Sequence, residues 1–166
     1  VFIVGCGRSG TALLCNLLSE HPLLVQTPGY PDGEDHVGWI EHGRCAISGL
    51  GATPDIDRGH SGGHLCLAMN EWDVRPATVE AMHLHYLQNV LEGDTSRFVI
   101  NKNSHLSNKL RYVRQIFPDA HFIHIVRDCA PMVSSWIREM ALQRYQLLYW
   151  PECALPCFSV LPRPSD

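Results

Sequence analysis

The sequence lacks three features that define large classes of proteins. It has no CxxC pair, no run of basic residues and no apolar stretch long enough to cross a membrane. The missing basic run and the net charge of -4 argue against nucleic-acid binding as the main function, because phosphate backbones require clustered Lys and Arg. The 7 cysteines show no repeating spacing and predict free thiols, so we expect a cytoplasmic protein.

The length and composition fit one folded unit. With 166 residues, of which 45% are hydrophobic, the chain can bury one sizeable core, and we expect residues 1–166 to form a single domain. The chain starts without Met, inside an apolar run, so we expect further residues before Val1.

Apolar runs alternate with helical patterns along the chain. Strands are predicted at residues 1–4, 97–101 and 121–126, and helices after the first strand, at about 77–91, at 106–117 and after Asp128. This order predicts an α/β fold of the P-loop-like, three-layer kind, with a central parallel sheet flanked by helices. In such a sheet a ligand lies at the carboxyl ends of the strands.

The first strand runs into a glycine-rich loop, Gly5 to Thr11, and then into a helical pattern. A loop of this kind points backbone N–H groups at one spot, where the helix dipole adds positive charge, so it predicts an anion site. The spacing resembles a P-loop, but the usual lysine is missing and Arg8 supplies the cation instead. A tight glycine turn that binds nothing is the alternative.

Two later strands also end in cations. Lys102 follows the strand at 97–101, and Arg127 closes the strand at 121–126. An arginine there can hold a phosphate with two N–H groups, and Ser135 on the next helix can reach the same group. The alternatives are a solvated lysine, a salt bridge at the strand end and a solvent-facing serine.

Two regions carry no regular pattern. Residues 43–73 are rich in Gly, His, Asp and Pro and predict a long irregular excursion over the active face. The four-residue spacing of His60 and His64 would bring two imidazoles to one metal ion only if the segment were helical. Ser61, Gly62 and Gly63 disfavour a helix, so we expect no metal site. The tail after Trp150 is interrupted by prolines and is predicted to be irregular.

Three segments taken together resemble the PAPS-dependent sulfotransferases. The loop from Arg8 to Thr11 resembles their 5′-phosphosulfate loop, and Phe122–Asp128 with Ser135 resembles their 3′-phosphate-binding segment. Lys102, ahead of Phe117-Pro118-Asp119-Ala120, resembles their sulfuryl-site lysine. The resemblance covers roughly residues 1–26 and 97–140 and is nearest to the bacterial and tyrosylprotein-type branch.

The resemblance implies transfer of a sulfuryl group from 3′-phosphoadenosine 5′-phosphosulfate (PAPS) to a hydroxyl or amine, without a metal. The 5′-phosphosulfate would be held by Arg8, Ser9, Gly10, Thr11 and Ala12, and the 3′-phosphate by Arg127 and Ser135. Arg8 and Lys102 would act on the transferring group, because such transfer depends on positioning and charge stabilisation.

The acceptor also requires a base within hydrogen-bond reach. Candidates are Glu34, Asp35 and His36, which come after the first helix, and His105. The tyrosylprotein branch uses a glutamate in this region, and His105 precedes Arg127 by a spacing similar to that of the catalytic histidine in the cytosolic branch. We rank Glu34 first and His105 second, with a solvated loop charge as the alternative for each.

The chain departs from the family in three ways. Cys129-Ala130-Pro131 replaces the usual residues after Arg127-Asp128, and Ser104 stands where proline is common. No basic glycine-containing loop follows Trp150, so we expect a chain that is incomplete at its C-terminus or compromised in activity.

Two other functions remain open from the sequence. One is a P-loop small-molecule kinase, which would use Mg-ATP, and the other is a non-catalytic nucleotide-binding homologue. For a sulfotransferase we expect a neutral small-molecule, lipid or carbohydrate hydroxyl acceptor, because the net charge of -4 disfavours acidic polysaccharides.

Overall fold

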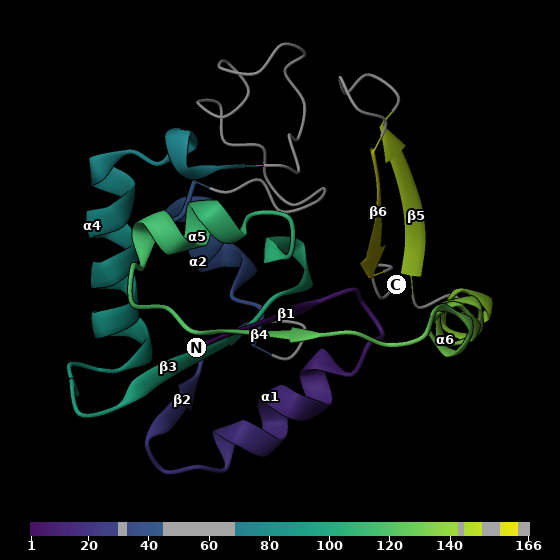
Figure 1. Ribbon diagram of the computed structural model, residues 1–166, viewed down its shortest axis with the longest axis horizontal. Coiled ribbons are helices and arrows are strands. Elements are labelled where there is room, and N and C mark those ends of the chain that lie inside the picture. The colour runs from purple at the N-terminus through teal and green to yellow at the C-terminus, as the bar shows by residue number, and fades with distance from the viewer. Residues whose placement is uncertain (30–32, 45–68, 143–144, 151–156, 163–166) are drawn as a thin grey trace.

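A computed structural model describes residues 1–29, 33–44, 69–142, 145–150 and 157–162. Its centre is a sheet of four parallel strands in the order β2-β3-β1-β4 (Figure 1). The strands are β1 (Phe2–Gly5), β2 (Leu24–Gln26), β3 (Phe98–Lys102) and β4 (Phe122–Ile125). The predicted α/β fold with a central parallel sheet is confirmed.

Helices cover both faces of this sheet. Helix α1 (Thr11–Ser19) lies on one face, and α2 (His36–Glu41), α4 (Pro76–His85) and α5 (Leu110–Ile116) lie on the other (Figure 1). Short turns are η1 (Glu71–Asp73), η2 (Tyr86–Val90) and η3 (Ser104–Leu106). Helix α6 (Cys129–Ala141) follows β4, beyond its carboxyl end.

The side-chain alternation of β1 divides the core into two layers. Phe2 and Val4 pack into the larger cluster with Trp39 of α2 and Met82 of α4, whereas Ile3 packs on the opposite face with Cys15 and its α1 neighbours. Successive side chains of a strand point to opposite faces, so a strand buried on both sides must be apolar at every position. The short run of apolar residues at the N-terminus therefore fixes β1 as a central strand.

The strand predicted at residues 121–126 lies at the edge of the sheet and is less buried than a continuous apolar run suggests. Phe122 stacks on Phe2 with ring centroids 5.7 Å apart, but His124 is exposed and Val126 is 80% exposed. The reason is position: β4 pairs with β1 on one side only within the four-stranded sheet.

The helix predicted at 106–117 is divided. The side chain of Asn103 accepts a hydrogen bond from the His105 N–H, at 2.9 Å, and starts the 3-10 turn η3, so the α-helix begins only at Leu110. The helix predicted at 77–91 forms as α4 and ends in the π-helical turn η2.

The prediction that the tail after Trp150 is irregular is wrong in part. Strand β6 (Cys157–Pro162) pairs antiparallel with β5 (Tyr145–Trp150), so the chain adds a second, two-stranded sheet. The backbone pairing overrides the prolines because Pro162 stands at the end of its strand. Most of the predicted excursion at 43–73, with His60 and His64, lies outside the described residues; residues 43–44 and 69–73, which include η1, are the described part.

Candidate functional site

The predicted site residues gather at the carboxyl edge of the sheet, in two groups. The arginine cluster consists of Arg8, Arg127, Ser135 and Glu139. The carboxylate cluster consists of Glu34, His36, Lys102 and His105. Both groups follow strand ends, because β1, β3 and β4 are parallel and all release their loops at the same edge.

The loop after β1 has a shape that requires glycine at two places. Gly5 has a φ of 155°, and a Cβ there would lie 2.7 Å from the Ile125 carbonyl oxygen of β4. A Cβ on Gly7 would lie 2.7 Å from the indole of Trp136 on α6. The loop is therefore packed between β4 and α6, and any side chain at these positions would push them apart.

The loop and the start of α1 have the properties of an anion site. Gly10, in a left-handed conformation, caps α1 without a side-chain hydrogen bond, and the first turn carries no acidic residue. The backbone N–H groups in the first turn of α1 therefore have no side-chain acceptor. The positive end of the helix dipole lies at the same place and favours a negatively charged ligand. The Ser9 hydroxyl is 8% exposed and has no hydrogen-bond partner among the described residues, so it has an unused donor in the same loop. Thr11 is buried beside it at the helix start.

The arginine cluster joins residues that are more than 100 positions apart. The Arg8 guanidinium donates from Nε to Ser135 Oγ at 3.0 Å and from its terminal nitrogen to Glu139 Oε1 at 3.1 Å. Arg127 donates to the Arg8 carbonyl at 2.9 Å. Arg8 has a φ of 69°, a left-handed conformation that few arginines adopt. Sequence reasoning missed Glu139; its signal is the four-residue spacing from Ser135, which places both on one face of α6.

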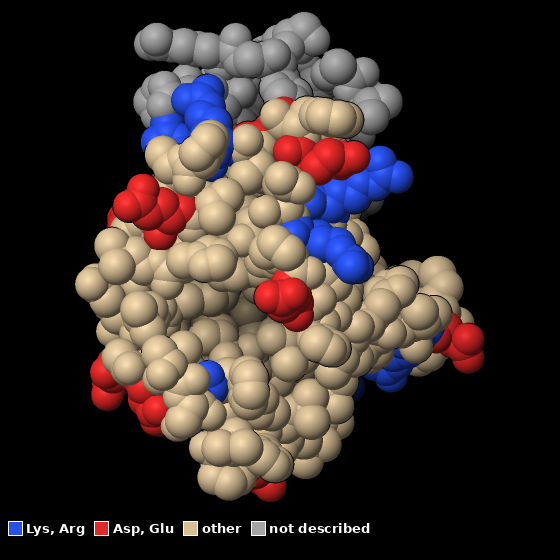
Figure 2. Space-filling model, turned by 60° about the vertical axis from the view of Figure 1, so that its left-hand side comes forward, with Lys and Arg blue, Asp and Glu red and all other residues tan. Residues whose placement is uncertain are grey.

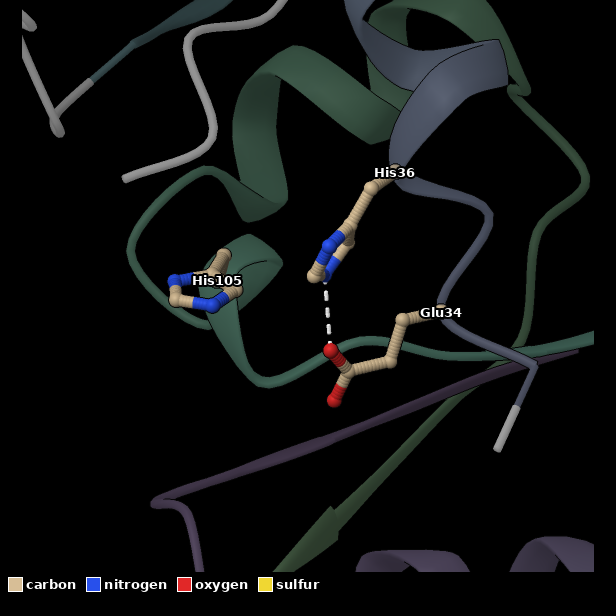
Figure 3. Close-up of side chains that lie close together, drawn as sticks. All are labelled: Glu34, His36 and His105. Atoms are coloured by element: carbon tan, nitrogen blue, oxygen red, sulfur yellow. Dashed lines mark ion pairs between the residues drawn. The ribbon is translucent and has the colours of Figure 1, made fainter. Parts of the chain in front are cut away.

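The carboxylate cluster is built around Glu34 (Figure 3). Lys102 donates to Glu34 Oε1 at 2.7 Å, and His36 Nε2 lies 2.7 Å from Glu34 Oε2. The His36 and His105 rings meet edge to face with centroids 5.4 Å apart, and both point toward the carboxylate. Glu34 and Lys102 are 6% and 3% exposed, so this is a buried ion pair. The structure thus brings together both ranked base candidates and the predicted sulfuryl-site lysine.

Burial and charge set the protonation of this cluster. Burial opposes ionisation of Glu34, but the hydrogen bond to His36 and the Lys102 ammonium outweigh it, so the pKa of Glu34 lies below its ordinary value. Burial lowers the pKa of His105 to about 4, against the attraction of the Glu34 charge. At neutral pH the cluster therefore holds an ionised carboxylate beside a neutral His105.

One further base candidate, Asp35, points away from the cluster. It has a φ of 47°, caps α2 by accepting from Gly38 N at 3.2 Å, and lies 2.9 Å from His85 Nε2 on α4. With this left-handed turn at Asp35, the side chains on either side of it meet each other in the carboxylate cluster. Asp35 therefore has a structural partner of its own, and sequence reasoning gave no sign of it because His85 is 50 residues away.

A depression of about 690 Å³ lies along α4, beside Gln115 of α5. Its lining residues are Val74, Pro76, Val79, Glu80, His83, Leu84, Leu87 and Gln115. Figure 2 shows a hollow on this side of the molecule, with acidic and basic side chains interspersed around it rather than gathered. It contains none of the predicted site residues.

The fold and site together define an α/β protein with a glycine-rich loop at the carboxyl edge of a parallel sheet. The chain belongs to the sulfotransferase family: the family model described as "Sulfotransferase family" matches residues 1–152. No curated protein and no solved structure matches. The family establishes sulfuryl transfer as the general reaction, and its members generally use PAPS. Within the described residues, no helix has the length and apolar character to span a membrane.

Proposed function

We propose that this protein transfers the sulfuryl group of PAPS to a hydroxyl or amine acceptor by direct in-line displacement. The observation that supports this most is the contact of Arg8 with Ser135 and Arg127, because these three residues come from the two motifs that would bind opposite ends of the donor. Family membership supports the same reaction and counts against the Mg-ATP kinase.

The residues of the loop fit the 5′-phosphosulfate of such a donor. The uncapped N–H groups at the start of α1, the unpartnered Ser9 hydroxyl and the buried Thr11 would all donate to an anion there. Backbone N–H groups of Gly10 and Ala12 would complete the set. Arg127, which is exposed, and Ser135 would hold the 3′-phosphate.

The arginine cluster implies a rearrangement when the donor binds. The Arg8 guanidinium contacts Ser135 and Glu139, and Glu139 is 7% exposed. The Glu139 carboxylate gives the Arg8 guanidinium the negatively charged partner that a bound phosphosulfate would otherwise provide. We propose that donor oxygens replace Glu139 at this guanidinium.

The chemistry follows from the charges at the carboxyl edge. The acceptor oxygen forms a bond to sulfur while the bond from sulfur to the bridging oxygen breaks, and the electron pair leaves with the 5′-phosphate. Arg8 and Lys102 would stabilise the charge that develops on the leaving oxygen and the sulfuryl group. Glu34 would accept the acceptor proton, so atoms and charge balance without a metal in the transfer step.

Glu34 is the base that the geometry favours over His105. Its carboxylate is ionised, lies at hydrogen-bond distance from Lys102, and belongs to the post-helix region in which the tyrosylprotein-type branch has its glutamate. His105 is neutral and lies beside the same carboxylate, so it is the second candidate. On this ground we propose that the chain is nearest to that branch.

The acceptor we propose is a neutral hydroxylated small molecule, lipid or carbohydrate. The experiment is an acceptor screen with PAPS, read by release of the desulfated nucleotide, on the wild type, Glu34→Gln and His105→Ala. Loss of turnover in Glu34→Gln alone supports the assignment, whereas loss in His105→Ala alone moves the base to His105. A sulfated-glycan precursor as the sole acceptor would contradict the charge argument.

Nucleotide-dependent melting separates the three functions. Stabilisation by 3′-phosphoadenosine 5′-phosphate without magnesium supports the sulfotransferase, and stabilisation by Mg-ATP alone supports the kinase. Stabilisation by 3′-phosphoadenosine 5′-phosphate without any transfer from labelled PAPS would identify a non-catalytic homologue.

We also propose a cytoplasmic location for this protein. The free thiols Cys6, Cys15 and Cys129 support it, because thiols stay reduced in the cytoplasm.

A further inference from the structure

Three side chains of the carboxylate cluster offer metal-ligand atoms to one point. Glu34, His36 and His105 each provide one such atom, and these atoms all lie within 4.8 Å of one another. Figure 3 shows both imidazoles directed at the Glu34 carboxylate from two different segments of the chain. Two imidazole nitrogens and one carboxylate oxygen form a set that suits Zn²⁺ and neighbouring first-row divalent ions.

The backbone that carries these ligands is fixed by one buried residue. Asn103, which is fully buried, donates from Nδ2 to the Glu34 carbonyl at 2.7 Å and accepts from the His105 N–H at 2.9 Å. Its own N–H donates to Ile3 of β1 at 3.1 Å. The two ligand-bearing segments are thus tied to each other and to the sheet before any ion binds, which lowers the ordering cost of binding.

The two oxygens of Glu34 have separate partners. Lys102 occupies Oε1, while Oε2 faces His36 Nε2 at 2.7 Å. An ion between Oε2 and the two histidines would take the place of the proton shared with His36 and would leave the lysine contact in place. The Lys102 ammonium would hold the Glu34 carboxylate in position. Its positive charge would also repel the divalent ion, and this repulsion limits the affinity of the site for the ion.

We propose that Glu34, His36 and His105 bind a divalent ion of the Zn²⁺ or Co²⁺ type, and that this ion prevents Glu34 from accepting the acceptor proton. The second half rests on the proposed function, whereas the first half does not. The transfer step needs no metal, so the site is inhibitory: a carboxylate oxygen coordinated to a cation is no longer a base.

The test of binding is a Co²⁺ titration of the full chain, followed by its visible absorption and checked by calorimetry with Zn²⁺. We expect one equivalent to bind with the spectrum of a low-coordinate N/O site, and His36→Ala to weaken it at least about tenfold. His124→Ala, which removes an exposed histidine outside the cluster, is the matched control. Equal affinity in wild type and His36→Ala would overturn the proposal.

Two further variants keep the test informative if His36→Ala folds poorly. His105→Asn removes a ligand from the second segment and must also weaken binding, while melting curves report whether the variant is folded. Lys102→Met removes the opposing charge and should tighten binding. Weaker or unchanged affinity in Lys102→Met would contradict the arrangement.

The inhibitory half is tested on active wild-type protein. Zn²⁺ should lower the rate of transfer from labelled PAPS, a chelator should restore it, and the nucleotide affinity should not change. Binding at the cluster with full activity would overturn the inhibitory half and would remove Glu34 as the base, while the metal site itself would stand. An absence of any PAPS turnover would instead count against the proposed function, because ion binding is measured independently of it.

Discussion

Lys102 Nζ lies 2.7 Å from Glu34 Oε1 in a buried ion pair between residues that are 68 positions apart. One residue closes β3, and the other precedes α2. Removing one member would leave the other buried and charged without this partner, so the pair resists substitution for physical reasons that are separate from catalysis. The predictions that involve either residue therefore include measurements of both folding and activity.

Arg127 should discriminate between nucleotides by their 3′-phosphate. Arg127→Ala should weaken binding of 3′-phosphoadenosine 5′-phosphate by about 1.5–3 kcal/mol, because it removes a charge-assisted pair, and should hardly change the analogue without that phosphate. Calorimetry with the two nucleotides measures the difference. Arg138→Ala, which removes an exposed arginine of α6, is the control; equal losses for both nucleotides would remove Arg127 from the 3′-phosphate site.

Lys102 should act more on turnover than on binding. Lys102→Ala should lower kcat by a larger factor than it raises the Kd of the donor, because the charge it stabilises develops only during transfer. The assay is transfer from labelled PAPS, with melting curves as a check on folding. An unchanged kcat in a folded variant would show that Lys102 does not touch the reacting group.

His105 should make the protein less stable as the solution is acidified. Its pKa is lowered from 6.5 to about 4 in the folded state, so the unfolded chain binds the proton more readily and stability falls between these two values. The loss amounts to at most about 3 kcal/mol. Urea denaturation at several pH values should show a flatter profile between pH 6.5 and 4 for His105→Asn, and an identical profile would exclude this cause.

Glu34 should contribute in a more acidic window. Because its folded pKa lies below the ordinary 4.5, its stabilisation is fully present above that value and is lost as the pH falls through the folded pKa. The difference in unfolding free energy between wild type and Glu34→Gln should therefore shrink as the pH drops below 4.5. Denaturant unfolding measures it, with His105→Asn as background to separate the two windows; a difference that grows on acidification would contradict the assignment.

Gly7 should couple the anion loop to α6. Gly7→Ala places a methyl group 2.7 Å from the Trp136 ring and should destabilise the fold by about 1–3 kcal/mol, as overpacking does. Trp136→Leu in the same chain should recover part of this loss. A double-mutant cycle from denaturation curves gives the coupling energy, which would be near zero if the loop and helix do not contact in solution.

The fold was predictable largely because the signals that define it are local. The apolar run at Phe2–Val4, the glycine loop and the helical spacing of α1 and α4 each lie within one segment, and their order implies a parallel sheet. Strand β2 has only three residues and was not predicted, because so short a segment carries no period. The pairing of β5 with β6 depends on contacts across an intervening segment, which local patterns do not encode.

In the candidate site, too, residues with local motifs were predictable and long-range contacts were not. Arg8, Lys102, Arg127 and Ser135 were named from motifs; Arg8 contacts Ser135 and Arg127, whereas Lys102 belongs to the carboxylate cluster at the same edge of the sheet. Their catalytic and binding roles stay predictions. Glu139, which contacts Arg8, was not named, because its local signal, the four-residue spacing from Ser135, does not by itself point to Arg8.

The left-handed turn at Asp35 makes the site depend on a distant helix. Glu34 contacts Lys102 and His36, while Asp35 faces His85 of α4, and His85 in turn lies 3.0 Å from Asn89. The segment that carries the proposed base is therefore tied to α4 through Asp35, in addition to its hydrogen bond with Asn103. We therefore expect a local opening of α4 to disturb the proposed site before the protein as a whole unfolds.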